Sequence, residues 1–259
     1  MVIIEWFLWL IAYSFIGWVY ESLICSIEQL KFVNRGFLNG PICPVYGFGA
    51  LVSIVFLYQK TDNLLILFFA GMLLTCTVEY FTAVLLEKLF HAKWWDYSHY
   101  RFNLQGRVCL LGAVVFGTLS VLLLKYVHPF VSGMLAQLPA HTRLVLALFL
   151  FTLLLLDLYV TVRHLLLLNN RLKEIQAAIN TFLGQYAKRY GALKDSLTEK
   201  FEESEFYNEH IKTLFNVSRF QNIRLIRAFP RLRPLKYGDA WQKLKGILLG
   251  RDDKSFPDK

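Results

Sequence analysis

Two glutamates, Glu21 and Glu79, stand inside long apolar stretches, and a polar turn of similar sequence follows each of them. Residues 35–43 read Arg-Gly-Phe-Leu-Asn-Gly-Pro-Ile-Cys, and residues 101–109 read Arg-Phe-Asn-Leu-Gln-Gly-Arg-Val-Cys. Six of these nine positions agree when Asn/Gln and Ile/Val are treated as equivalent. Each turn leads into a new helix, whose N-terminus presents unsatisfied N–H groups and the positive end of the helix dipole. Together with the arginines, two such helix ends could hold a phosphate or a carboxylate.

The same residues also fit a structural role, in which Glu21 and Glu79 neutralise the arginines of the turns and fix the packing of the helices. Carboxylates inside a membrane segment are costly and are a sign of function, so both interpretations stay open. The candidate binding residues are the charged, amide and thiol side chains of the two copies: Glu21, Arg35, Asn39, Cys43, Glu79, Asp96, Arg101, Asn103, Gln105, Arg107 and Cys109.

Two further carboxylates need partners of their own. Asp96 lies in an aromatic segment, residues 94–100, which is inserted in the second copy and is typical of a membrane interface. Asp96 either caps a turn or binds a cation, and capping is the favoured interpretation. Asp157 lies inside a later apolar stretch, where we expect it to pair with Arg163 or His164.

Motifs for other chemistries are missing from the sequence. The four cysteines (Cys25, Cys43, Cys76 and Cys109) include no CxxC pair, so we expect structural thiols rather than a zinc or redox site. The sequence contains neither a Walker A loop nor a G-x-S-x-G elbow. We identify no catalytic residue, no metal site and no cofactor, and enzymatic activity is not indicated.

The elements that position these residues are predicted to be membrane helices. Hydrophobic residues make up 56% of the 259-residue chain and charged residues 18%, whereas a soluble domain carries about 25% charged residues. Apolar stretches of about 20 residues cross a bilayer as helices, and five are expected: about residues 5–27, within 36–59, 63–86, 108–127 and 144–162. The prediction is an all-α polytopic membrane protein with its transmembrane domain in residues 1–168.

The two similar turns are two spans apart, which predicts a parallel repeat of two-helix units, residues 5–59 and 63–130. Lys and Arg gather in the loops after spans one and three and in the chain after span five, and cytoplasmic loops carry an excess of these residues. We therefore expect a plasma-membrane protein with its N-terminus outside and its C-terminus in the cytoplasm.

The formal net charge of +9 divides into +2 for residues 1–168 and +7 for residues 169–259. Apolar residues at steps of three and four predict a cytoplasmic amphipathic helix over residues 169–217. Residues 218–259 are expected to form a basic amphipathic segment with a disordered end. Anionic lipids are its favoured partner and nucleic acid is the less favoured one. The residues expected at the membrane surface are Arg219, Arg224, Arg227, Arg231, Arg233 and Lys236.

Three segments carry a family resemblance: residues 40–47 (Gly-Pro-Ile-Cys-Pro-Val-Tyr-Gly), 94–98 (Trp-Trp-Asp-Tyr-Ser) and 102–110 (Phe-Asn-Leu-Gln-Gly-Arg-Val-Cys-Leu). With them, about residues 5–130 resemble a bacterial family of multi-pass membrane proteins known as ABC-transporter type IV, or CmpB-like, proteins and often labelled ABC transporter permeases. The resemblance implies transport and a separate ATPase subunit as partner.

The residues and the resemblance together support two functional hypotheses. The first is a transport component that binds an anionic or amphipathic solute at the cytoplasmic side of the repeat interface, with an ATPase subunit or a second copy of the chain as partner. The second is a membrane-embedded protein or enzyme that acts on lipid headgroups at the cytoplasmic leaflet. A scaffold that recruits partners through its basic end would leave the intramembrane charges with a packing role alone.

Overall fold

The computed structural model describes residues 2–190 and 219–249. These residues divide into two compact units. Unit 1 comprises residues 1–89 and 94–162, and unit 2 comprises residues 90–93 and 163–259. Each unit is described separately below.

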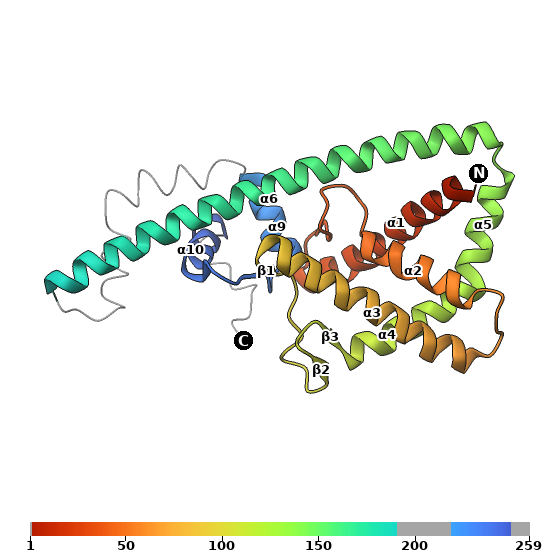
Figure 1. The fold of residues 1–259 in the computed structure, drawn as a ribbon, viewed down its shortest axis with the longest axis horizontal. Helices are drawn as coiled ribbons and strands as arrows, with labels where there is room; N and C mark the ends of the chain where they lie inside the picture. The colour runs from red at the N-terminus through yellow and green to blue at the C-terminus, as the bar shows by residue number, and fades with distance from the viewer. Residues whose placement is uncertain (1, 191–218, 250–259) are drawn as a thin grey trace. The chain divides into compact units, whose positions relative to one another are not determined.

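Unit 1 is mainly helical, as its composition predicts (Figure 1). Four helical segments are long and apolar enough to cross a membrane: Val2–Gln29, Leu64–Phe90, Leu110–Gln137 and Ala140–Thr181. The all-α membrane class is therefore confirmed. The elements are α1 (Val2–Gln29), α2 (Pro44–Leu57), α3 (Leu64–Phe90), α4 (Leu110–Leu122), the π-helical turn η1 (Leu123–Val127), α5 (His128–Gln137) and the start of α6 (Ala140–Tyr190).

The second expected span is shorter in the structure than its sequence suggests. Its helix, α2, has 14 residues, which is about 21 Å at about 1.5 Å per residue, against a hydrocarbon core of about 30 Å. The chain before it, from residue 31 to Cys43, is not helical. The N–H of Cys43 donates to the carbonyl of Ser14 at 2.9 Å, so α2 begins beside the middle of α1.

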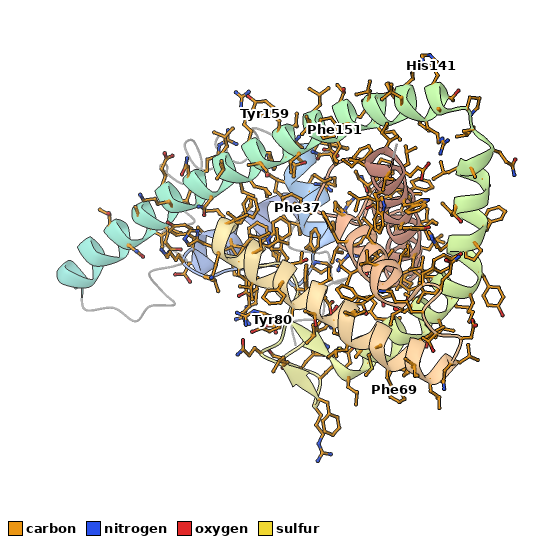
Figure 2. All side chains as sticks on the ribbon, turned by 45° about the vertical axis from the view of Figure 1, so that its right-hand side comes forward. Phe37, Phe69, Tyr80, His141, Phe151 and Tyr159 are labelled. Atoms are coloured by element: carbon orange, nitrogen blue, oxygen red, sulfur yellow. The ribbon has the colours of Figure 1, made fainter. Side chains whose placement is uncertain are left out.

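Large apolar side chains cover the outside of the long helices. Phe69, Phe81, Leu148 and Tyr159 are each more than half exposed. Figure 2 shows Tyr159 and His141 of α6 pointing away from the other helices. A soluble protein rarely exposes so much contiguous apolar surface, and in a bilayer this surface contacts lipid.

Glycines bring the helices of unit 1 into close contact. A Cβ atom on Gly17 of α1 would stand 2.3 Å from Cβ of Tyr46 in α2, and one on Gly47 would stand 2.3 Å from Oγ of Ser14. In the same way, a Cβ on Gly71 of α3 would stand 2.4 Å from Cβ of Ser120 in α4. Such contacts between small residues are how helices associate in lipid, where no hydrophobic force drives them together.

The fourth expected span bends at its end. The backbone hydrogen bonds change from the α-helical to the π-helical pattern at η1, and Pro129 follows in the first turn of α5. As a result, α5 runs in a different direction from α4 (Figure 1). Proline and π-turns are the usual causes of helix kinks. The bend places His128 in the core, where its Nδ1 lies 2.6 Å from the hydroxyl of Tyr13.

Unit 2 has its own hydrophobic core. It contains the C-terminal part of α6, then α9 (Arg219–Ala228), the strand β4 (Arg233–Pro234) and α10 (Gly238–Leu249). The strand β1 (Ala92–Lys93) pairs with β4 in antiparallel fashion. Apolar side chains of these elements are almost completely buried, among them Ile175, Leu225, Ile226, Trp241 and Leu244.

The C-terminal region therefore differs in part from its predicted organisation. The expected helix over residues 169–217 is present as far as Tyr190, and residues 191–218 and 250–259 lie outside the described residues. The apolar residues among the arginines of α9, expected to face lipid, form the core of unit 2 instead. Hydrophobic periodicity marks a buried face without distinguishing a bilayer from a protein core.

The two copies of the predicted repeat share some local features. Each first helix ends before a residue in the left-handed region, Leu30 with φ 52° and His91 with φ 52°. Each second helix begins directly after the matching cysteine, Cys43 or Cys109. The second copy adds the hairpin of β2 (Asn103–Leu104) and β3 (Val108–Cys109). The repeat and the number of membrane crossings stay predictions.

The orientation can be tested with reporter fusions. Five crossings, with α2 and the chain before it counting as one, place the two termini on opposite sides of the membrane, whereas four crossings place them on the same side. We expect green fluorescent protein fused after Lys259 to fluoresce and alkaline phosphatase fused there to be inactive. The same reporters fused before Met1 should give the reverse result, and a matching result at both ends would contradict the five-crossing topology.

The contact between α1 and α2 can be tested by adding a methyl group. Gly17→Ala places a Cβ inside the van der Waals radius of Tyr46, so the helices must separate, at a cost of about 1–3 kcal/mol. Gly133→Ala is the matched control, because a Cβ there meets nothing within 4 Å and alanine is the better helix former. Thermal unfolding of the purified protein should show a lower Tm for Gly17→Ala and an equal or higher Tm for Gly133→Ala.

Candidate functional site

The carboxylate of Glu21 is held by two partners from different elements. Its Oε2 lies 3.3 Å from Nε of Arg35, and its Oε1 accepts a hydrogen bond of 2.5 Å from the hydroxyl of Tyr46. Glu21 and Arg35 therefore form a charged pair at the start of the first repeat turn.

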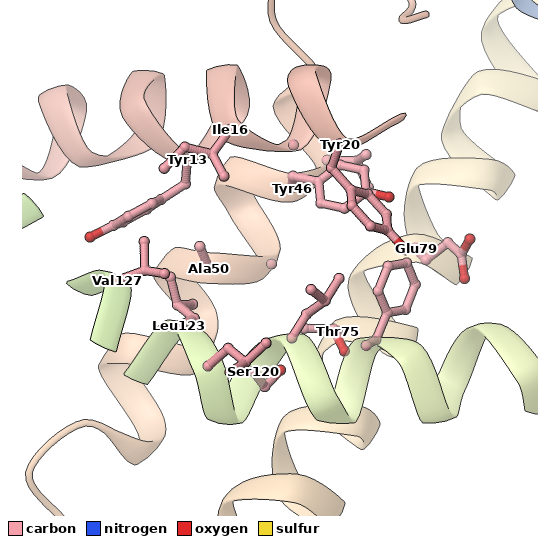
Figure 3. Close-up of a pocket in the computed structure, with 16 residues that line it drawn as sticks. Tyr13, Ile16, Tyr20, Tyr46, Ala50, Thr75, Glu79, Ser120, Leu123 and Val127 are labelled. Atoms are coloured by element: carbon pink, nitrogen blue, oxygen red, sulfur yellow. The ribbon is translucent and has the colours of Figure 1, made fainter. Parts of the chain in front are cut away.

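Glu79 has a different environment. It is 7% exposed, and its Oε1 accepts a hydrogen bond of 3.3 Å from the hydroxyl of Tyr97. No salt bridge joins Glu79 to any residue that the structure describes. Figure 3 shows Tyr46, whose hydroxyl donates to Glu21, beside Glu79. The structure thus brings the two repeat glutamates into one cluster with Tyr46 and Tyr97.

A cavity of about 230 Å³ opens next to this cluster. Its walls come from the four helices of the two repeat copies, α1, α2, α3 and α4 with η1. Figure 3 shows Glu79 at one end of the cavity, with Tyr20 and Tyr46 beside it, and Tyr13 and Val127 at the other end.

The chemistry of the cavity wall is apolar along its length and acidic at one end. Tyrosine rings, Phe116 and aliphatic side chains make up most of the lining. Among the few polar groups, the hydroxyl of Thr75 already donates to the backbone of its own helix. Glu79 is the one ionisable carboxylate among the lining residues. The cavity therefore fits a small molecule with an apolar body and one polar or cationic group.

The arginines of the second turn lie outside this cluster. Arg107 forms a salt bridge of 2.7 Å with Glu87, and it also contacts Gln105 and the hydroxyl of Tyr80. The hydrogen bond to Glu87 raises the pKa of Arg107. Arg101 is exposed and lies over the ring of Phe102 at 5.7 Å. Arg35 and Arg107 are each paired with a glutamate and Arg101 is exposed, and the anion site expected from these three arginines stays a prediction.

The polar residues of the inserted hairpin form its turns. Oδ1 of Asp96 accepts from the backbone N–H and the hydroxyl of Ser98 at 2.9 and 2.5 Å, which is the capping role favoured for it. Asn103 donates to the carbonyl of Tyr100 and accepts from the N–H of Gly106. Cys109 accepts from the N–H of Gly112 at the start of α4.

Asp157 binds the turn of the first repeat copy rather than the predicted Arg163 or His164. Its Oδ1 accepts from the backbone N–H and the side-chain amide of Asn39, at 3.0 and 3.1 Å. Its Oδ2 accepts from the N–H of Gly40 at 2.7 Å, and Thr161 of the same helix also donates to Oδ1. The prediction was wrong because it considered only neighbours in the sequence, and the true partners are 118 and 117 residues away.

The thiol of Cys43 is structural. It is buried and donates to the carbonyl of Arg35 at 3.4 Å. Among the described residues, no three His, Cys, Asp or Glu side chains are grouped to hold a metal ion.

Tyr46 and Tyr97 complete the cluster and are not among the binding residues predicted from the sequence. Tyr46 lies in the Gly-Pro-Ile-Cys-Pro-Val-Tyr-Gly segment, and Tyr97 lies in the inserted aromatic segment. Both segments carried the family resemblance, which was the available signal. Tyr97 was assigned to an interfacial belt because an aromatic cluster at a helix end is typical of one.

The bonds of Asp157 give a test of this arrangement. Asp157→Asn keeps the shape of the side chain but replaces one acceptor oxygen by a donor, which leaves a backbone N–H of the Asn39–Gly40 turn without a partner. We expect a loss of about 2–3 kcal/mol in stability, seen as a lower Tm of the purified protein. Asp62→Asn is the control, because that carboxylate is exposed and ion pairs in solvent contribute little. Equal effects of the two variants would contradict a structural role for Asp157.

Comparison with known proteins places this unit in a family. Residues 8–162 match the model of the family described as Putative ABC-transporter type IV. No curated protein and no solved structure matches the chain. The matched region covers more than half of the sequence and ends at Val162, where unit 1 also ends. It contains both repeat turns, both glutamates and Asp157, and the chain therefore belongs to the Putative ABC-transporter type IV family.

Proposed function

We propose that this membrane protein is a transport component that binds a small amphipathic solute in the cavity between its two helix pairs. The observation that carries the proposal is the position of Glu79. This carboxylate is 7% exposed, forms no salt bridge with a described residue, and stands at one end of an otherwise apolar cavity. A buried carboxylate of this kind is costly unless it is paired, and in membrane proteins it marks a pathway or a ligand site.

The shape and lining of the cavity limit the class of solute. Ligand pockets commonly enclose about 300–1,000 Å³, so a cavity of about 230 Å³ suits a small molecule. Tyr13, Phe116 and the aliphatic residues contact an apolar body, and Glu79 accepts hydrogen bonds from an ammonium or another donor group. The site thus selects an amphipathic molecule with a cationic or donating end.

An anionic solute has less support. It requires arginines that are available to it, and Arg35 is engaged with Glu21 while Arg107 is engaged with Glu87. Action on lipid headgroups remains a second candidate function, because Glu21 and Glu79 cluster near the polar hairpin at one end of the helices. The family assignment favours transport and an ATPase subunit as the energy source.

Three ligands of equal length test the role of Glu79. Hexylammonium, hexanol and hexanoate have six carbon atoms each and differ in the charge of one end. We expect the purified protein in nanodiscs to bind hexylammonium most tightly in calorimetric titrations. Glu79→Gln should weaken this binding about tenfold, because a hydrogen-bonded charge is replaced by a neutral amide.

Glu87→Gln is the matched control, since Glu87 binds Arg107 and does not line the cavity. It should leave the affinity for hexylammonium unchanged. Tightest binding of hexanoate, or an equal loss in both variants, would contradict the proposal. Mass spectrometry of phospholipids retained by the wild type and by Glu79→Gln distinguishes the headgroup alternative, which requires loss of a bound phospholipid in the variant.

A further inference from the structure

Unit 2 contains a two-stranded ribbon with an unfavourable pair of charges. β1 and β4 are antiparallel, with Ala92 opposite Pro234 and Lys93 opposite Arg233. The N–H of Leu235 extends the pairing by donating to the carbonyl of His91 at 2.8 Å. Like charges directly opposite each other destabilise a strand pair, so Lys93 and Arg233 reduce the stability of this ribbon.

The surface around the ribbon is strongly basic. Arg231, Arg233 and Lys236 are exposed, and Leu235 between them is 56% exposed. From residue 219 to residue 249 the sequence has eight Lys or Arg and one acidic residue, Asp239. Most apolar side chains of this segment, such as Ile226 at 1% exposed, are buried within unit 2, whereas Phe220 and Leu235 are exposed. The exposed surface therefore presents mainly cations and does not offer the apolar face of a membrane-inserting helix.

The ribbon is connected directly to a membrane helix. α3 is one of the four long apolar helices and ends at Phe90. His91 takes the left-handed conformation that ends the helix, with φ 52°, and β1 starts at Ala92. Two residues of chain reach at most about 7 Å. The strand that carries Lys93 therefore follows this apolar helix with one intervening residue, His91.

We propose that the β1–β4 ribbon, through Lys93 and Arg233 with Arg231 and Lys236 beside them, binds the phosphate groups of anionic phospholipids. An anion between the two opposed cations relieves their repulsion, so lipid binding stabilises the ribbon. Leu235 lies between the cations and can contact the interfacial region. The connection of β1 to α3 favours lipid over nucleic acid as the source of the phosphate. This surface is independent of the cavity in unit 1.

Hydrogen exchange of the full-length protein in vesicles tests this proposal. The measurement compares amide protection of the peptide that contains β4 in pure phosphatidylcholine and in a phosphatidylcholine–phosphatidylglycerol mixture. We expect the mixture to slow exchange, by about fivefold for each cation at the surface, and high salt to remove the gain. The double variant Lys93→Gln with Arg233→Gln should show no gain from phosphatidylglycerol.

The double variant also separates lost lipid binding from misfolding. In pure phosphatidylcholine its ribbon should be as protected as that of the wild type or more so, because the repulsion is gone. Lys173→Gln, which removes an exposed cation from α6 in unit 2, is the control and should keep the gain. Equal protection of the wild type in both kinds of vesicle overturns the proposal. So does a full gain in the double variant, or protection by a single-stranded oligonucleotide that exceeds protection by phosphatidylglycerol.

Discussion

The hydrogen bonds that Asp157 accepts from Asn39 and Gly40 fix the arrangement of unit 1. Lipid offers no partner for the N–H groups of non-helical backbone, and this carboxylate supplies one from a distant helix. With the turn held there, Cys43 meets the carbonyl of Ser14 and α2 begins beside the middle of α1. The first turn of α2, and not its middle, therefore lies next to the charged cluster.

From that starting point the candidate site follows. Tyr46 lies in the first turn of α2, so its hydroxyl reaches Glu21 while its ring lines the cavity. Glu21 is then engaged by Tyr46 and Arg35, and Glu79 is left as the acidic end of the cavity. The two glutamates occupy matching positions in the sequence, yet their partners give them different roles. One holds the turn in place, and the other faces the space where a solute fits.

The sequence predicted the apolar helices and the family, because apolar length and short motifs are local signals. Glu21 and Glu79 could be selected as candidate residues because charges are rare inside apolar stretches. It did not predict the partner of Asp157, since contacts more than 100 residues apart leave no local pattern. The sequence also does not indicate that Arg107 pairs with Glu87 and not with Glu79. Both of these glutamates lie on α3, and only the rotation of that helix decides which of them Arg107 can reach. In α6 the spacing of apolar residues predicts one helix face, and Leu172, Ile175 and Ile179 of that face are buried. Spacing alone cannot identify what covers that face, and Leu225 and Ile226 pack within the protein.

The contact between Gly17 and Tyr46 constrains residue 17 through the backbone of α2. A Cβ atom at residue 17 would lie 2.3 Å from Cβ of Tyr46. Every residue except glycine carries a Cβ atom, so exchanging Tyr46 for another such residue does not make room at residue 17. Because Tyr46 also binds Glu21 and lines the cavity, a glycine with no chemistry of its own is constrained as strictly as the residues of the site. A lineage that loses this glycine must rebuild the cavity wall as well.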